Sequence, residues 1–343
     1  MLILGGIVIE PMKVEIQTLT PIWTGDAEGK CTTIKETAII GSMRWWYEAI
    51  VRGMGGYACD PTSEQSCQFD SKAYDEEYKR YLKANESKEL ASKYALEAGL
   101  KKVCPACRLF GCTGWKRRFK ILVNNFGGTF TQERNDGYSG NFEIEFYEIF
   151  NISDSEKWLL YQTLQIIENY GAFGGRTTRK PQNNQVGKDY GLIKVNLVNA
   201  DWARKSDYNK TQKWIETITE NCGKSNNKKW FNFRYYWVIK GEYLDRLKMN
   251  EIFGLDNKGN VVTGEDKFLE FLRGNRASSG KTGSSKKIFS FKSGNKVFGY
   301  VRNEQELDII KRKLQTKIKQ DINSIITGND ILQNIQNGRN EDV

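Results

Sequence analysis

The chain has 343 residues, 39% of them hydrophobic, and carries a formal net charge of +10. This length is enough for two or three domains with their own cores, and no apolar run is long enough to cross a membrane. The sequence contains no histidine, which removes the commonest general base and every nucleophile pair that depends on imidazole. We therefore expect a cytoplasmic binding protein whose partner is a polyanion, because its cations alternate with aromatic residues.

Alternating strands and helices are predicted between residues 12 and 200. The apolar run before them, residues 2–9, lacks the basic flank of a signal peptide. Alternation of apolar and polar residues predicts strands at residues 13–19, 119–124, 142–146 and 193–197. Helices are predicted at residues 43–54 and after the capping box Ser153-Asp154-Ser155-Glu156, ending at Gly171. The order βαββαβ is that of a ferredoxin-like or RRM-like domain.

A long insertion, about residues 55–117, separates the first predicted helix from the second strand. It is expected to hold one charged helix near residues 75–100, flanked by cysteines. Four thiolates could hold a tetrahedral structural zinc, with Cys112 as a spare ligand, and only one pair among them has the C-x-x-C spacing. Small buried cysteines without metal are the alternative. The four candidate ligands are Cys59, Cys67, Cys104 and Cys107.

The second half of the chain, residues 201–343, repeats the pattern of the first half only in part. Residues 221–229 are polar and rich in lysine, as in a linker or loop. The elements expected after it are a strand at 234–239, a helix at 266–272, a hairpin of 287–291 and 297–301, and a helix at 304–319. No closing strand is evident. We therefore predict an α+β protein with two ferredoxin-like domains, residues 12–200 and 201–343, the second of them incomplete.

The first predicted helix is apolar on one side and basic and aromatic on the other. Residues 40–42 are expected to form a tight turn that leads into it. Arg44, Trp45 and Arg52 fall off the apolar face, where they could hold a phosphate and stack a base. The alternative is that Trp45 packs under a loop and that the arginines are ordinary solvated charges.

Three loops could bind RNA phosphates through glycines, cations and hydroxyls. The glycine loop, residues 171–180, follows a helix, which argues against a P-loop or dinucleotide site; it could also be a helix stop with a mobile basic tail. In residues 109–118, one or both aromatic side chains could instead fill the gap between the insertion and the sheet. Residues 273–279 could be a charged turn. The candidate residues in these loops are Phe110, Trp115, Lys116, Arg117, Gly174, Gly175, Arg176, Arg179, Lys180, Arg276 and Ser278.

Several segments together resemble one family. They are residues 19–25 (LTPIWTG, with Trp23), 40–46 (IGSMRWW), 107–111 (CRLFG), 171–176 (GAFGGR) and 276–278 (RAS). The chain resembles the RAMP superfamily of CRISPR-associated proteins, most closely the first subunits of type III-B (Cmr) effector complexes. The resemblance runs from residue 13 to about residue 292. It does not place the cysteine-bearing insertion.

This resemblance implies a non-catalytic subunit that binds guide RNA near its 3′ end and helps to admit target RNA, among the other subunits of the complex. It makes Trp23, the helix with Arg44 and Trp45, the turn at 110–117 and the glycine loop RNA-facing positions. The hypothesis needs arginines and rings from separate loops to converge in one groove. Two alternatives remain: a metal-independent endoribonuclease that matures guide RNA through Tyr or Lys, and a stand-alone zinc-containing RNA-binding protein.

Overall fold

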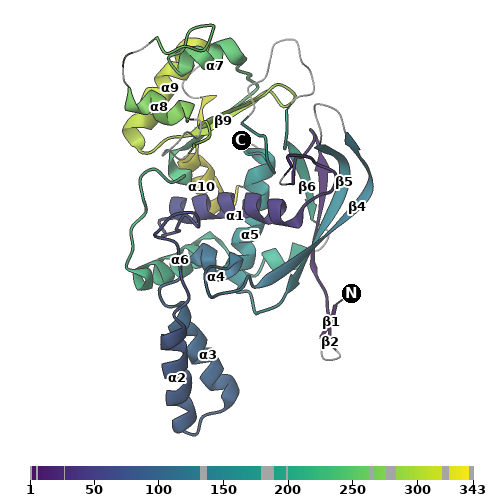
Figure 1. The fold of residues 1–343 in the computed structure, drawn as a ribbon, viewed down its shortest axis with the longest axis vertical. Helices are drawn as coiled ribbons and strands as arrows, with labels where there is room; N and C mark the ends of the chain where they lie inside the picture. The colour runs from purple at the N-terminus through teal and green to yellow at the C-terminus, as the bar shows by residue number, and fades with distance from the viewer. Residues whose placement is uncertain are drawn as a thin grey trace.

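The computed structural model describes residues 2–4, 7–26, 28–131, 137–178, 189–197, 200–262, 264, 266–275, 283–318 and 324–339. Within them the chain forms two four-stranded antiparallel sheets with helix α1 (Glu36–Gly53) between them (Figure 1). No helix among the described residues is long and apolar enough to span a bilayer. Short strands β1 (Leu2–Leu4) and β2 (Ile7–Ile9) pair with each other ahead of the first sheet.

The first sheet has the strand order β4-β5-β3-β6 and contains the four strands that the sequence pattern predicts. They are β3 (Met12–Thr18), β4 (Phe119–Thr131), β5 (Gly137–Glu148) and β6 (Ile193–Leu197). Met12, Val14 and Ile16 of β3 and Phe142, Ile144 and Phe146 of β5 are buried in one core with α1 and α5 (Asp154–Asn169). The predicted capping box begins α5, because the Ser153 side chain accepts from the Glu156 amide and the Glu156 carboxylate accepts from the Ser153 amide. The predicted element order is confirmed.

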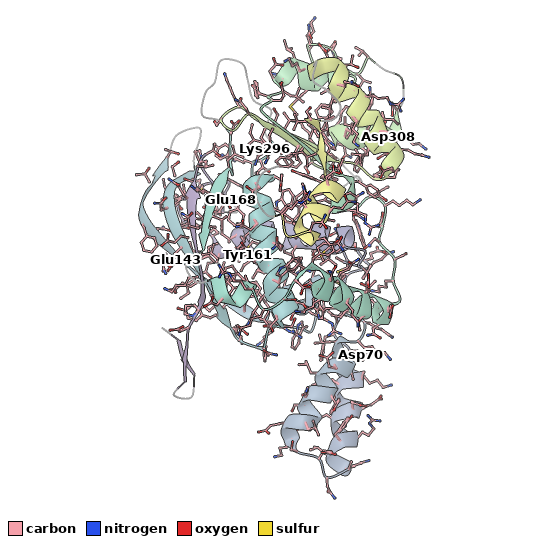
Figure 2. The ribbon with its side chains drawn as sticks, turned by 180° about the vertical axis from the view of Figure 1, so that it is seen from behind. Asp70, Glu143, Tyr161, Glu168, Lys296 and Asp308 are labelled. Carbon is pink, nitrogen blue, oxygen red and sulfur yellow. The ribbon has the colours of Figure 1, made fainter. Side chains whose placement is uncertain are left out.

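The outer face of this sheet, which points away from α1 and α5, has an acidic centre. Glu15 and Glu143 lie directly opposite each other on β3 and β5. Lys13 forms ion pairs with Glu143 and with Glu145, the latter at 2.6 Å. Figure 2 labels Glu143 on this sheet. RRM-type domains stack bases on aromatic side chains of these central strands, and the outer face does not offer that surface at its centre.

The insertion contains three helices, where the sequence pattern predicted one charged helix. Helices α2 (Ser71–Lys83) and α3 (Lys88–Leu100) form an antiparallel hairpin that projects from the body (Figure 1). The predicted single helix is wrong because Ser87 caps a new helix by accepting from the Leu90 amide. Tyr81 and Tyr94 stack across the hairpin with ring centroids 4.6 Å apart. Helix α4 (Pro105–Phe110) then returns the chain to the body.

The second sheet has the strand order β10-β7-β9-β8, so it repeats the connectivity of the first. Its strands are β7 (Tyr236–Lys240), β8 (Ile288–Phe291), β9 (Lys296–Tyr300) and β10 (Ile326–Thr327). The expected lack of a closing strand is wrong: β10 pairs with β7 through only two residues, too few to show a periodic pattern. One face of the sheet packs on α7 (Arg246–Ile252), α8 (Lys267–Arg273) and α9 (Glu304–Ile318).

The other face of the second sheet packs on the first domain through aromatic rings. Trp46 of α1 lies 5.8 Å from Tyr236 and 6.0 Å from Phe298, measured between ring centroids. The connection between the domains contains η1 (Ala200–Ala203), α6 (Tyr208–Cys222) and η2 (Phe233–Tyr235), and α10 (Gly328–Gln336) ends the described chain. Helix α1 therefore contributes to a core that the two domains share.

Candidate functional site

Helix α1 places candidate residues on different sides of its axis. The helix starts at Glu36, so the tight turn predicted at residues 40–42 is wrong and Gly41 and Ser42 are helical. Successive residues lie about 100° apart around the axis, which puts Ser42 and Arg44 on opposite flanks with Gly41 and Trp45 on the outward ridge between them. Each flank then receives a different loop.

The glycine loop packs against the Ser42 flank. The Gly174 amide donates to the Ser42 hydroxyl at 3.0 Å, and the Gly175 amide donates to the Trp23 carbonyl at 2.8 Å. Gly174 has φ of 84°, and a β-carbon there would lie 3.0 Å from the Trp23 carbonyl oxygen. Glycine is therefore required for this close approach.

Arg176 lies in the same loop with φ of 58°, a region that residues other than glycine seldom occupy. Its guanidinium lies 4.4 Å from the Trp23 ring centroid and donates to the Gly29 carbonyl at 3.2 Å. The second domain supports the loop as well, because the buried Lys296 ammonium donates to the Gly171 carbonyl at 2.7 Å. Burial lowers the pKa of Lys296 to about 7. Figure 2 labels Lys296 at this junction.

Trp45 is the only exposed tryptophan, and all nine tryptophans lie in the described part of the chain. The residue is 37% exposed, and its ring centroid lies 4.5 Å from that of Phe231 and 5.9 Å from that of Tyr300. Phe231 and Tyr300 stack on each other at 4.4 Å. Trp45 thus lies at the edge of a layer of packed aromatic rings that joins α1 to the second domain, with part of its surface open to solvent.

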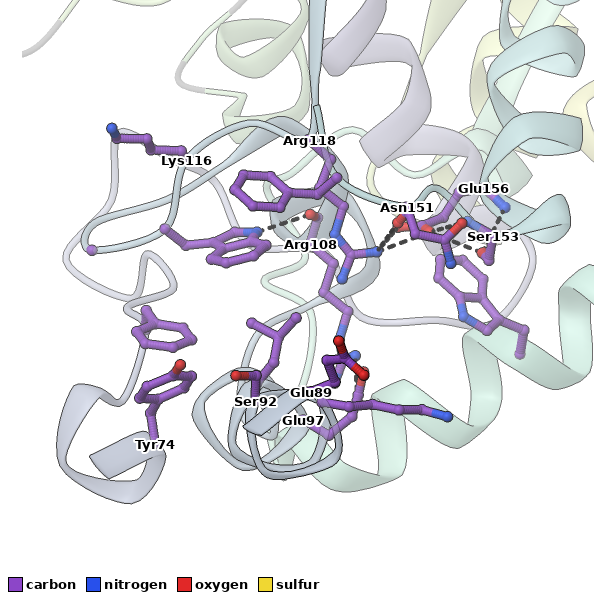
Figure 3. A pocket seen from close by; sticks show the side chains of 17 residues that line it. Tyr74, Glu89, Ser92, Glu97, Arg108, Lys116, Arg118, Asn151, Ser153 and Glu156 are labelled. Atoms are coloured by element: carbon purple, nitrogen blue, oxygen red, sulfur yellow. Dashed lines mark hydrogen bonds and ion pairs between the residues drawn. The ribbon is translucent and has the colours of Figure 1, made fainter. Parts of the chain in front are cut away.

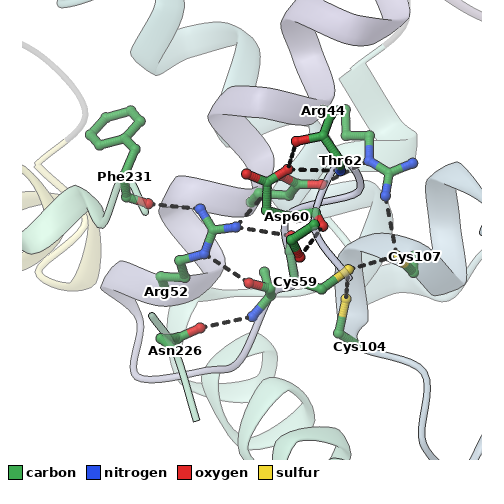
Figure 4. Close-up of polar contacts among 12 residues, drawn as sticks. Arg44, Arg52, Cys59, Asp60, Thr62, Cys104, Cys107, Asn226 and Phe231 are labelled. Atoms are coloured by element: carbon green, nitrogen blue, oxygen red, sulfur yellow. Dashed lines mark hydrogen bonds and ion pairs between the residues drawn. The ribbon is translucent and has the colours of Figure 1, made fainter. Parts of the chain in front are cut away.

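Arg44 turns away from the outward ridge toward the cysteines (Figure 4). Its guanidinium donates to the Glu48 carboxylate at 2.7 Å, the Gly111 carbonyl at 3.0 Å and the Cys107 sulfur at 3.1 Å. Burial raises the pKa of the Glu48 carboxyl to about 7, although Arg44 opposes that shift. Through these contacts Arg44 holds α1 to the insertion. The prediction that Arg44 faces solvent and binds a phosphate is therefore wrong.

Arg52 is buried in the core, at 5% exposure, and also departs from its predicted position (Figure 4). Its guanidinium donates to the carbonyl groups of Ala58, Cys59 and Phe231 at 2.8–3.0 Å. A solvated face was expected because Arg52 lies off the apolar stripe of the helix. The chain after α1 and the connection between the domains cover that face instead, so Arg52 is a structural residue.

The turn at residues 111–118 is divided between core and surface. Phe110 is buried, and Trp115 stacks on Phe69 at 5.7 Å while its indole N–H donates to the Arg108 carbonyl at 3.0 Å. Both rings therefore pack between the insertion and the body, which is the alternative named for them. Lys116 is exposed, and the half-buried Arg117 donates to the Phe119 carbonyl at 2.7 Å.

A cavity of about 920 Å³ lies beside this turn, between the α2–α3 hairpin and the start of α5 (Figure 3). Two guanidinium groups line it, and both are paired: Arg108 with Glu97 at 3.0 Å and Arg118 with Glu156 at 3.1 Å. Trp115, Phe150 and Trp214 contribute apolar surface. These two arginines are therefore committed to carboxylates, whereas Lys93 and Lys116, which also line the cavity, form no ion pair among the described residues.

The prediction that Arg44, Arg117 and Arg176 converge in one groove is wrong. On one flank of α1, the Arg44 guanidinium donates to the Gly111 carbonyl. The backbone of Arg117 lies beside the same glycine, where a β-carbon on Gly111 would be 2.9 Å from the Arg117 amide nitrogen. Arg176 lies on the other flank with the glycine loop. The predicted residues Arg179, Lys180, Arg276 and Ser278 fall outside the described residues.

A pocket that sequence reasoning missed lies where Trp45, the glycine loop and the second sheet meet. Its volume is about 230 Å³, and the second domain contributes Ser285, Phe289, Phe298 and Tyr300 to it. Tyr300 belongs to a correctly predicted hairpin, yet nothing in the local pattern places it next to Trp45. Only the packing of the second sheet on α1 brings residues 45 and 300 together.

The four predicted metal ligands gather into one buried cluster. The sulfur atoms of Cys59, Cys67, Cys104 and Cys107 all lie within 4.8 Å of one another, and Cys112 is outside this group. Tetrahedral zinc with sulfur at about 2.3 Å would separate the sulfur atoms by about 3.8 Å. The Cys59 sulfur lies 3.4 Å from that of Cys107 and 4.0 Å from that of Cys104. All seven cysteines are free, so the geometry and donor set fit a metal site.

Comparisons with known proteins give a family match and distant structural likenesses, of which two follow. Residues 15–179 match the model of the RAMP superfamily. Apo Cmr1 from Pyrococcus furiosus is 11% identical, with a TM-score of 0.40 over 85% of this chain and 88% of that chain. A chain in a cryo-EM structure of the type III-B Cmr-beta complex, bound to cognate target RNA and AMPPnP, is 11% identical with a TM-score of 0.44, over 90% of this chain and 99% of that chain. No curated protein matches this chain.

Proposed function

Because residues 15–179 match the model of the RAMP superfamily, we propose that this chain is a non-catalytic RNA-binding subunit of a type III CRISPR ribonucleoprotein. Its partners are guide RNA near the 3′ end, target RNA and the neighbouring subunits of the complex. The proposal includes two ferredoxin-like domains, and the strand order of each sheet, which is that of a βαββαβ unit, supports it. The type III-B (Cmr) complex is the assembly that this proposal names.

The observation that carries the proposal is the exposed Trp45 beside the glycine loop, both within the matched residues. A ring that is partly open to solvent can stack a base, and a glycine backbone lets a sugar-phosphate chain approach closely. The Arg176 guanidinium lies in the same loop, over the Trp23 ring. The acidic centre of the outer face disfavours RNA there, so the proposed path runs over the outward ridge of α1.

The first experiment measures binding of labelled single-stranded RNA to the full chain over a range of salt concentrations. We expect the affinity to fall with salt, by about 0.7 logarithmic units per phosphate contact for each tenfold rise. Trp45→Ala should lower the affinity about tenfold at every salt concentration, because it removes stacking and leaves the charges unchanged. Tyr94→Ala, at an exposed ring on the α2–α3 hairpin, is the matched control and should bind like the original chain. An affinity that does not respond to salt would contradict the proposal.

The same mixtures test the non-catalytic role. RNA recovered from them, with or without EDTA, is expected to be intact, because without histidine an RNA-cleaving reaction would rest on Tyr or Lys. Discrete products in the presence of EDTA would support the metal-independent endoribonuclease instead. Native purification of the chain free of other CRISPR subunits would support a stand-alone RNA-binding protein.

The cysteine cluster is proposed to hold one structural zinc ion through Cys59, Cys67, Cys104 and Cys107. Such an ion would join the two ends of the insertion and fix the base of the α2–α3 hairpin. The Arg44 guanidinium, which donates to the Cys107 sulfur, would orient that ligand and connect the metal site to α1. The zinc is structural in this proposal, since all four ligand positions are filled by protein.

A further inference from the structure

The small pocket beside Trp45 has a lining suited to one planar aromatic group. It is bounded by three separate parts of the chain: α1, the glycine loop, and the β8–β9 hairpin with the segment before it. We propose that this pocket takes a single base of single-stranded RNA, stacked against Trp45, while the sugar-phosphate chain passes along the glycine loop. This inference rests on the proposed function and specifies where the protein would hold a base of the bound RNA.

The aromatic wall of the pocket is already ordered. The Phe231 ring packs on Trp45 at 4.5 Å between centroids, and Tyr300 stacks on Phe231 at 4.4 Å. Phe289 and Phe298, which also line the pocket, stack on each other at 4.6 Å. A ligand ring that enters this space meets surfaces that other rings hold in place, so little side-chain ordering is needed on binding.

On the side of the glycine loop, the rim of the pocket carries hydroxyl groups that have no hydrogen-bond partner among the described residues. They belong to Thr177, Thr178 and Ser285. The Ser42 hydroxyl already accepts from Gly174, and the Trp46 indole N–H already donates to the Ala172 carbonyl at 3.1 Å. A hydroxyl can donate or accept, so this rim can satisfy the edge of any base without selecting one.

The second domain holds the rim in position through Lys287. Its buried ammonium donates to the Ser285 carbonyl and lies 5.2 Å from the ring centroid of Phe271. Ser285 itself is exposed and is one of the residues that line the pocket. A larger side chain at this position would enter the mouth of the pocket without disturbing the core.

The size and chemistry of the pocket exclude other occupants. A volume of about 230 Å³ is below the range of about 300–1,000 Å³ that drug-sized ligands occupy, and it cannot admit a helix or a base pair. No carboxylate or cysteine lines it among the described residues, so it has no set of metal ligands. A single unstacked base fits both the apolar wall and the hydroxyl rim.

The test compares two labelled oligomers of equal length, an oligouridylate and an abasic ribose-phosphate chain, by fluorescence anisotropy with the full protein. Both carry the same charge, so their difference reports base contacts alone. We expect the oligouridylate to bind about tenfold more tightly. Ser285→Phe should reduce its affinity to that of the abasic oligomer and leave abasic binding unchanged. Ser284→Phe, the exposed neighbour outside the pocket, should keep the full difference.

The outcomes separate this inference from the proposed function. Equal binding of both oligomers by the original chain, or a full base-dependent difference in Ser285→Phe, would overturn the pocket and leave RNA binding intact. Binding of neither oligomer would overturn both proposals. Thermal unfolding of the two serine variants at the same temperature as the original chain would show that the fold is retained.

Discussion

Replacing Cys104 with serine is expected to release the proposed zinc and to lower the free energy of unfolding by more than about 3 kcal/mol. Cys104 is fully buried within the cluster, and its sulfur lies 4.0 Å from that of Cys59. Losing one of four ligands removes binding energy that in zinc-finger peptides amounts to about 10–16 kcal/mol. The metal link between the two ends of the insertion would then be lost.

Metal analysis of the purified chain and urea unfolding measure this effect. The control is Cys222→Ser, because Cys222 is buried on α6 outside the cluster and its loss should leave the zinc content unchanged. One zinc per chain in the original protein and in this control, with none in Cys104→Ser, is the expected result. Purification of the original chain without metal under chelator-free conditions would rule out the proposed site.

The second large effect is expected at Arg52, whose substitution by methionine should destabilise the protein by about 3–5 kcal/mol. The change removes hydrogen bonds to three buried carbonyl groups and leaves Glu48 with Arg44 as its cationic partner. Each buried acceptor left without a partner costs about 1–3 kcal/mol. The midpoint of urea unfolding should fall at constant slope.

Lys116→Met provides the comparison for Arg52, since Lys116 is an exposed cation and its loss should change stability by less than about 0.5 kcal/mol. Folded Arg52→Met should bind single-stranded RNA like the original chain, because the guanidinium does not reach the surface. If Arg52→Met kept its stability but lost RNA affinity, Arg52 would be an RNA-binding residue, and its structural role would be contradicted.

Local sequence patterns were sufficient for the elements that are long and regular. The strands β3, β4, β5 and β6 alternate strongly, and the capping box at Ser153 marks the start of α5. The four cysteines could be grouped because the C-x-x-C spacing of Cys104 and Cys107 narrows the search for partners in the same insertion. In each case the signal lies within a few residues or in a distinctive residue type.

The errors arose where long-range packing decides the outcome. Strand β10 is two residues long, and it exists because β7 offers an edge to pair with. Arg44 and Trp45 are neighbours in the sequence, and helical geometry sends one toward the cysteines and the other to the surface. The pocket needs Tyr300, whose position depends on how the second sheet packs on α1. A single sequence does not encode that placement in any local pattern.

Photocrosslinking tests the central claim most directly, namely that RNA passes over the outward ridge of α1 beside the glycine loop. Single-stranded RNA that contains 4-thiouridine would be irradiated with the full chain, and the attached peptides identified by mass spectrometry. We predict crosslinks at Trp45 and within residues 174–178. Crosslinks confined to the outer face of the first sheet, at strands β3 and β5, would contradict this path.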